Sequence, residues 1–217
     1  ATILKRMYNS TNRDSGSTAR GLITLNEKSG CKIQDLQIDG NKAECRVSYN
    51  SGIYLYSSSN NTITGNTCYN NYGEGIYLSS SSNNTITGNT CYNNSGYSCI
   101  YLYSSSNNTI TGNTCYNNYN SSIYLYSSSS NNTVTGNTCY SNYNYGIRLS
   151  SSSNNNTVTG NTCYNNNYGI YISLASNNNT VTGNTCNNNN NYGIRLSSAS
   201  NNTVTGNACN NNRYIGI

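Results

Sequence analysis

Apolar and polar residues alternate along this chain in short runs, and the same runs return until the chain ends. Residues 53–69 show the pattern once, with aliphatic residues and a cysteine at alternate positions and tyrosine or threonine between them. A period of two residues is typical of β-strands that bury one face. The alternation points four side chains of this unit inward: Ile53, Leu55, Ile63 and Cys68. The intervening tyrosines and threonines are predicted to face outward.

The cysteine of this unit marks a fixed repeat. It recurs at steps of 23 or 24 residues: Cys68, Cys91, Cys115, Cys139, Cys163, Cys186 and Cys209. Strands this short, separated by Gly and Asn turns, cannot bury a core alone, so successive units must stack on one another. The sequence therefore predicts an all-β, single-stranded solenoid of about nine coils.

The first 49 residues follow the same plan less regularly. Residues 23–25 align with residues 53–55, and Ile38 falls at the position of Cys68. This alignment predicts that the beginning of the chain forms an early coil of the same solenoid, with a longer connection through Cys45.

The domain organisation follows from this alignment. We expect residues 1–49 to form irregular N-terminal coils and a cap, and residues 50–217 to form the regular repeats of the same single domain. The chain stops at residues 215–217, inside what should be another strand, so we expect it to be a piece of a longer protein. No apolar run approaches the length that spans a membrane.

The repeat resembles that of a known fold family. Residues 83–90, Asn-Asn-Thr-Ile-Thr-Gly-Asn-Thr, and the Ile-Tyr-Leu of residues 100–102 look like the right-handed parallel β-helix repeat. Pectate-lyase-like proteins, periplasmic copper-site maturation proteins and many phage tail spikes share that repeat. Residues 36–41 are similar to the first coils of pectate-lyase-like domains in phage tail proteins. The resemblance covers roughly residues 21–217 and implies a right-handed parallel β-helix, which fits the handedness of parallel crossovers in general.

Composition narrows the chemistry that this fold can carry. The chain has no His, which removes the usual general base and the commonest metal ligand, so we expect neither a cofactor nor a metal site. The net charge is +5, and eight of the eleven Lys and Arg residues lie in the first 46 residues. Because this charge is diffuse, we do not expect nucleic acid as a partner.

The recurring cysteine is interpreted as a core residue, because Ile38 occupies its position in the first coil. A buried thiol of this kind is inert. The alternative is a metal-binding or redox ladder, but no coil brings a second ligand such as His. Cys31, Cys45 and Cys99 lie outside the row, and a Cys31–Cys45 disulfide is one way to pair two of them. The asparagine after each turn glycine predicts a ladder of amides that bond from coil to coil.

The outward residues between the two inward aliphatics are expected to stack into one row that binds carbohydrate. This row consists of Tyr54, Tyr77, Tyr101, Tyr124, Arg148, Tyr171 and Arg195. A second row follows the cysteines: Tyr69, Tyr92, Tyr116, Tyr140 and Tyr164. Exposed aromatic rings beside Asn, Ser and Arg can stack on sugar rings and bond to hydroxyl groups. Tyrosines are also favoured at subunit interfaces, and they suit strands with no further role.

Two further possibilities depend on other residues. Two outward threonine rows begin at Thr62 and Thr64, and flat Thr-x-Thr grids occur in ice-binding solenoids, although threonine also simply suits strands. Polysaccharide hydrolysis requires a pair of carboxylates, and only Glu74 lies in the regular repeats. Asp39 and Glu44, with Asp35, form the other candidate group, but Asp39 precedes Gly-Asn and is expected to cap a turn.

We therefore hypothesise a non-enzymatic structural and recognition module and name no catalytic residue. The resemblance implies a phage tail-spike-like or similar surface protein that binds cell-surface polysaccharide, at the virion or cell surface, as a homotrimer. The first alternative is a polysaccharide lyase or hydrolase of the pectate-lyase-like class. The second is an ice-binding solenoid that uses the threonine rows.

Overall fold

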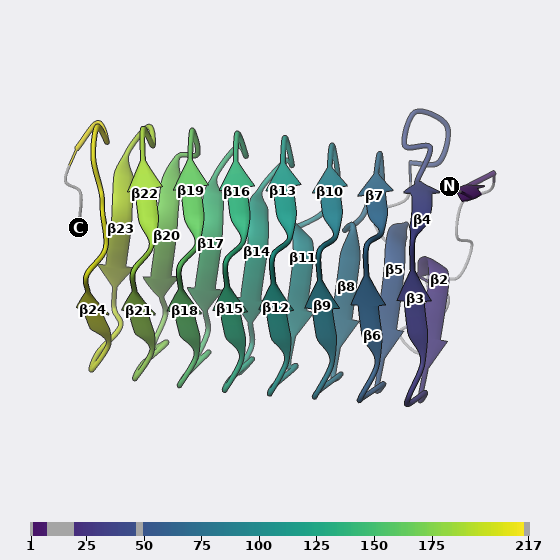
Figure 1. Ribbon diagram of the computed structural model, residues 1–217, viewed down its shortest axis with the longest axis horizontal. Coiled ribbons are helices and arrows are strands. Elements are labelled where there is room, and N and C mark those ends of the chain that lie inside the picture. The colour runs from purple at the N-terminus through teal and green to yellow at the C-terminus, as the bar shows by residue number, and fades with distance from the viewer. Residues whose placement is uncertain (1, 8–19, 47–49, 215–217) are drawn as a thin grey trace.

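The computed structural model describes residues 2–7, 20–46 and 50–214, and the regular elements of these residues are all β-strands. Figure 1 shows the chain winding from one end to the other as a solenoid. The strands form three sheets, each with eight strands, and all pairings between neighbouring strands are parallel. No helix in the described part of the chain is long and apolar enough to cross a membrane.

Each sheet collects one segment of the repeat, and we name the sheets after those segments. The tyrosine sheet contains β2 (Gly21–Asn26), β5 (Ser51–Tyr56), β8 (Ile76–Ser79), β11 (Ser98–Tyr103), β14 (Ser121–Tyr126), β17 (Tyr145–Ser150), β20 (Tyr168–Ser173) and β23 (Tyr192–Ser197). The threonine sheet contains β3 (Lys32–Gln34), β6 (Thr62–Thr64), β9 (Thr85–Thr87), β12 (Thr109–Thr111), β15 (Thr133–Thr135), β18 (Thr157–Thr159), β21 (Thr180–Thr182) and β24 (Thr203–Thr205). The cysteine sheet contains β1 (Thr2–Lys5), β4 (Leu36–Asp39), β7 (Thr67–Tyr69), β10 (Thr90–Tyr92), β13 (Thr114–Tyr116), β16 (Thr138–Tyr140), β19 (Thr162–Tyr164) and β22 (Thr185–Asn187).

The register confirms the predicted early coil. Ile23 pairs with Ile53, and Ile38 pairs with Cys68. The described residues form eight strands in each sheet, fewer than the nine or so coils that we expected. Residues 215–217, where we expected a further strand, lie outside the described residues, as do 1, 8–19 and 47–49.

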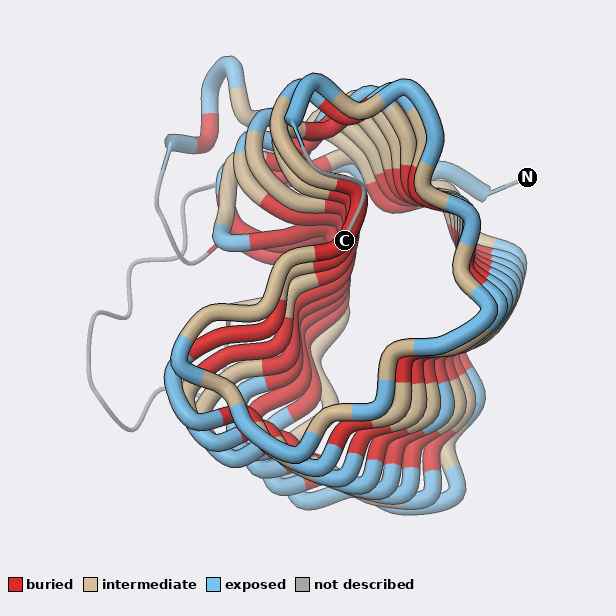
Figure 2. The backbone as a smooth tube through the Cα atoms, turned by 90° about the vertical axis from the view of Figure 1, so that its left-hand side faces the viewer, coloured by how far each residue is buried: buried red, intermediate tan, exposed pale blue. Residues whose placement is uncertain are grey.

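The core is a continuous column of inward side chains. All four residues predicted to face inward, Ile53, Leu55, Ile63 and Cys68, are fully buried, and their equivalents repeat this in the following coils as far as Cys186. In the last coil, Leu196, Val204 and Cys209 are partly buried. In Figure 2, which looks along the solenoid, the buried positions of successive coils lie behind one another. Burial of such stacked aliphatic side chains provides the main stabilisation of the fold.

The predicted asparagine ladder also lies inside the wall of the solenoid. Asn89, Asn113 and Asn137 are each 1% exposed, and the side-chain Nδ2 of each donates to the Oδ1 of the next. The glycine before each of these asparagines has a positive φ, for example 63° at Gly136. Glycine adopts this conformation without the Cβ clash that other residues incur, so it turns the chain between two sheets.

Candidate functional site

The seven residues predicted to bind carbohydrate do form one row on the tyrosine sheet. The strand register aligns each with the next along the solenoid: Tyr54, Tyr77, Tyr101, Tyr124, Arg148, Tyr171 and Arg195. The period-two pattern placed them on the outer face of their strands, and the structure confirms that they alternate with the fully buried aliphatic residues. The row is therefore continuous over several coils.

The prediction that this row is an exposed aromatic surface is wrong for its four leading tyrosines. Tyr54, Tyr77, Tyr101 and Tyr124 are only 3–9% exposed. Their ring centroids lie 5.0, 5.0 and 5.3 Å apart from one coil to the next, so each ring covers its neighbour. Tyr126 packs against the same cluster. A sugar ring therefore cannot stack on the faces of these four rings.

The second half of the row is more accessible and carries positive charge. Arg148, Tyr171 and Arg195 are each partly exposed. The guanidinium carbon of Arg148 lies 4.7 Å from the ring centroid of Tyr124 and 4.9 Å from that of Tyr145. Arg195 makes the same kind of contact with a tyrosine ring of its own coil. Cation–π contacts of this kind hold the guanidinium groups against the sheet.

A groove runs over the tyrosine sheet and includes part of the predicted row. Its volume is about 640 Å³. It is lined by Arg20, Glu74, Tyr77, Tyr97, Tyr101, Tyr103, Asn120, Tyr124, Tyr126, Arg148 and Leu174. Four predicted residues thus meet in one site, and Tyr54, Tyr171 and Arg195 lie outside its lining.

Glu74 is the carboxylic acid of this groove. It is 6% exposed, and its Oε2 accepts a hydrogen bond of 2.9 Å from the Ser51 hydroxyl. Its Oε1 accepts a longer bond of 3.4 Å from the Tyr97 backbone N–H. Burial raises the pKa of the Glu74 carboxyl, while these hydrogen bonds and the charge of Arg20 oppose the shift. The group can therefore hold a proton at a higher pH than an exposed carboxyl.

The phenol groups on the groove floor are also perturbed. Burial, reinforced by the nearby Glu74, raises the pKa of Tyr77 to about 12. Burial raises the pKa of Tyr101 as well, and the neighbouring Tyr77 and Tyr124 add to the effect. These phenols therefore remain protonated at neutral pH and can donate hydrogen bonds as well as accept them.

The second predicted tyrosine row lies on the cysteine sheet as a regular stack. Its ring centroids, from Tyr69 to Tyr164, are 4.9–5.3 Å apart, and neighbouring planes differ by at most 10°. All five residues are partly exposed. As in the first row, each inner ring face is covered by the next ring, so the stack offers ring edges and hydroxyl groups to the solvent.

The most exposed tyrosines lie in the loops that follow the cysteine sheet. Tyr119 and Tyr143 are 67% and 73% exposed, and their rings stack with centroids 5.9 Å apart. They border a shallow hollow of about 760 Å³ whose lining also includes asparagine side chains and Lys42. These two residues were not among the predicted site residues, because the loops vary in length and have no fixed position in the repeat.

Two other predictions have clear outcomes. Asp39 caps a turn as expected, because its Oδ1 accepts a 2.9 Å hydrogen bond from the Asn41 N–H. The Cys31–Cys45 disulfide is not formed, and the two thiols contact different carbonyl groups, those of Ser29 and Arg6.

Within the described residues, no group of His, Cys, Asp or Glu is arranged to hold a metal ion.

Some of the groove residues that were not predicted could have been identified from the sequence, and others could not. Glu74 carried a signal, because it is the one acid within the regular repeats. Tyr103 and Tyr126 occupy the last position of their strands, where the other coils have Tyr56, Asn26 or Ser, so their register was also readable. Arg20 comes from a segment without a repeated pattern, and Leu174 replaces the Ser that follows the strand in other regular coils, such as Ser198. Only the folded structure shows that these two residues line the groove.

The fold is shared with solved structures of low sequence identity. A mutant of the periplasmic alginate epimerase AlgG matches with a TM-score of 0.70 and 21% identity, over 83% of this chain and 45% of the other. The Dettilon tailspike protein matches with a TM-score of 0.60 and 18% identity, over 84% and 48%. The Azotobacter vinelandii mannuronan C-5 epimerase AlgE6 A-module matches with a TM-score of 0.57 and 16% identity, over 87% and 76%.

This chain thus spans about half the length of two of these proteins. No curated protein matches the sequence significantly. The sequence does match the right-handed beta helix region over residues 21–186 and, in a second match, over residues 150–217. Together the two matches extend from the first long strand to the end of the chain. The protein therefore belongs to the right-handed β-helix family.

Proposed function

We propose that this β-helix is a recognition module that binds a polysaccharide in the groove over the tyrosine sheet. One observation carries the proposal: the groove gathers several phenols, an asparagine amide, a carboxyl and guanidinium groups over neighbouring coils. Hydroxyl-rich ligands are held by groups of these kinds, because each can donate to or accept from a sugar hydroxyl. A groove that extends along a repeating sheet also suits a ligand that itself repeats.

The mode of contact follows from the stacking of the tyrosines. The ring faces of Tyr77, Tyr101 and Tyr124 are covered by one another, so the groove floor presents ring edges and polar atoms. We therefore assign the recognition to hydrogen bonds and to the guanidinium of Arg148. This replaces the sugar-stacking surface that we expected from the sequence.

The solved structures that share this fold support a polysaccharide as the class of ligand. Their names describe an alginate epimerase, a mannuronan epimerase and a tailspike protein. A tail-spike-like or other surface module, located at the virion or outside the cell and assembled as a homotrimer, is the form of the proposal that we favour. Oligomeric state is measured directly by light scattering of the purified chain, and a monomer would remove the trimer from the proposal.

Isothermal titration calorimetry with alginate and with neutral dextran oligosaccharides tests polysaccharide binding. Arg148→Gln removes a charged donor from the groove, and we expect it to weaken binding about 10-fold. Arg195→Gln is the matched control, because Arg195 lies in the same row and contacts a tyrosine ring but does not line the groove. Equal losses for both variants, or no binding to either polysaccharide class, would count against the groove.

Catalysis is the second candidate, and Glu74 is the observation that favours it. A buried carboxyl with a raised pKa is suited to proton transfer. Hydrolysis, however, needs two carboxyl groups, and among the described residues that line the groove Glu74 is the single acid. Release of unsaturated or reducing ends from alginate, abolished by Glu74→Gln, would establish an enzyme. Binding without product release would support recognition alone.

The third candidate function is ice binding by the threonine sheet. Its two rows, which begin at Thr62 and Thr64, stay in register along the sheet. Ice binding by this face would appear as thermal hysteresis in solution, and its absence would remove the candidate.

A further inference from the structure

Cys99 occupies a position at which neighbouring coils have no thiol. It lies near the start of β11, and the strand register places it level with Gly75 and Ser122 of the adjacent coils. The regular coils that the structure describes from residue 50 onward otherwise have Gly or Ser at this position. The extra cysteine is thus a departure from the repeat.

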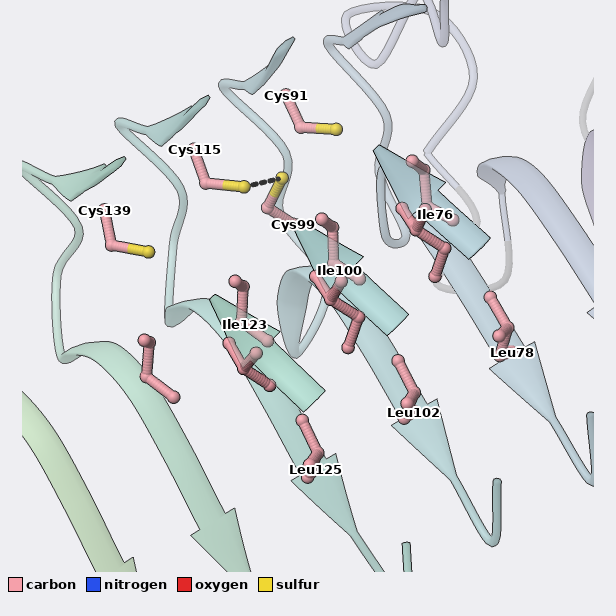
Figure 3. Packing of buried hydrophobic residues seen from close by; sticks show 14 of the residues in the cluster. Ile76, Leu78, Cys91, Cys99, Ile100, Leu102, Cys115, Ile123, Leu125 and Cys139 are labelled. Atoms are coloured by element: carbon pink, nitrogen blue, oxygen red, sulfur yellow. Dashed lines mark hydrogen bonds between the residues drawn. The ribbon is translucent and has the colours of Figure 1, made fainter. Parts of the chain in front are cut away.

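The side chain of Cys99 points at a cysteine of the same coil. Figure 3 shows its sulfur directed across the core at Cys115 of β13. The two Sγ atoms are 3.0 Å apart, and both residues are fully buried. This separation is about 1 Å longer than a disulfide bond, which measures about 2.04 Å.

The backbone of the solenoid brings this position close to the row of cysteines in other coils as well. A Cβ placed on Gly146 would lie 3.0 Å from the Cβ of Cys163, and one placed on Gly75 would lie 3.4 Å from the Cβ of Cys91. Disulfides have Cβ–Cβ distances of about 3.5–4.5 Å. The two Cβ–Cβ distances are slightly shorter than this range, so a small increase in the separation allows a disulfide at this position. A thiol is available there only where Cys99 replaces the glycine or serine.

We propose that Cys99 and Cys115 are a disulfide-forming pair that closes one coil of the solenoid. The two thiols release two protons and two electrons as the S–S bond forms. An oxidant of the disulfide class, such as oxidised glutathione, accepts them through a mixed disulfide and leaves as two thiols. The bond forms as the coil closes during folding, before the core excludes the oxidant.

The proposed disulfide lies next to the groove, but its formation does not depend on a bound ligand. β11 carries Tyr101 in the groove floor, and Tyr97 in the groove wall precedes the strand by one residue. The bond links this strand to the cysteine sheet. The inference rests on the two sulfur atoms alone and is independent of the proposed polysaccharide binding.

Peptide mapping of protein refolded with oxidised glutathione tests the proposal. Cleavage after tyrosine separates residues 98–101, which contain only Cys99, from residues 104–116, which contain only Cys115. Free thiols are alkylated before digestion, and mass spectrometry then finds these two peptides joined, and separated after reduction. Two separately alkylated peptides, or a Cys99 peptide joined to the Cys91 peptide, would overturn the pairing.

Two variants extend the test to stability. The oxidised protein is expected to melt on the order of 5 °C higher than the protein refolded with reductant. Cys99→Ser, which introduces the residue found at Ser122, abolishes this difference. Cys163→Ser is the control and keeps it, because Cys163 faces Gly146. Should Cys99→Ser fail to fold, the map of the unaltered chain still decides; an equal melting temperature with and without the crosslink would contradict the predicted effect.

Discussion

Asn113 lies in the middle of the amide ladder, so its replacement by alanine measures what the ladder contributes to stability. Its Nδ2 donates to the carbonyl oxygens of Ile86 and Thr111 at 3.0 and 3.2 Å, and to Asn137 Oδ1 at 3.0 Å. Its Oδ1 accepts from the backbone N–H and the Nδ2 of Asn89 at 2.9 and 3.0 Å. One side chain therefore bonds to both neighbouring coils.

Asn113→Ala removes all of these bonds and leaves buried groups without them. The backbone N–H of Asn89 loses its acceptor, and the carbonyl of Ile86 loses a donor. Both groups lie beside ladder residues that are 1% exposed. Each buried polar group left unpaired costs about 1–3 kcal/mol. We therefore expect the free energy of unfolding to fall by about 4 kcal/mol.

Urea denaturation followed by circular dichroism measures this loss. Asn190→Ala is the matched control, because the Asn190 side chain is exposed. We expect the control to change the free energy of unfolding by less than about 0.5 kcal/mol. A repeat protein can unfold in segments, so the slopes of the transitions must agree before midpoints are compared. Equal stability of the two variants would refute the role assigned to the ladder.

Two further predictions concern single positions. Because burial raises the pKa of the Glu74 carboxyl, the folded chain binds the proton more tightly than the unfolded chain does. The free energy of unfolding should then decrease as the pH rises from the unfolded pKa through the folded one, and Glu74→Gln should remove this decrease in urea titrations at several pH values. Gly136 has a φ of 63° and open space where a Cβ would lie, so Gly136→Ala should cost about 1 kcal/mol through backbone strain alone. Gly136→Asn should cost less in the same urea titration, since asparagine tolerates this conformation, and equal costs would contradict the strain argument.

Much of the fold was readable because one short pattern repeats. The spacing of Cys68 and its equivalents gave the period, and the alternation around Ile53 and Leu55 gave the buried face. Replacement of Ile38 by Cys68 in the next coil identified the cysteine as a core residue, and both are 0% exposed. Such inferences need only local periodicity and the requirement that short strands stack.

The site was less predictable, because alternation tells which side of a strand a residue is on but not what covers it. Tyr101 is on the outer side as predicted, yet the stacked rings of its own row and Tyr97 from the preceding loop cover it. The loops vary in length, so the positions of Tyr97 and Arg20 at the groove cannot be derived from the period. The proximity of Cys99 to Cys115 likewise depends on how a coil closes in three dimensions.

The most direct test of polysaccharide recognition in the groove is a comparison of two Tyr→Phe variants that each lose one hydroxyl group. Tyr101→Phe changes the groove floor, and Tyr140→Phe makes the same chemical change in the stacked row on the cysteine sheet. Titration calorimetry with a polysaccharide that binds the unaltered chain should give about 3- to 10-fold weaker binding for Tyr101→Phe. Binding by Tyr140→Phe should be unchanged. Unchanged binding by Tyr101→Phe together with a loss in Tyr140→Phe would place the ligand on the cysteine sheet and contradict the account.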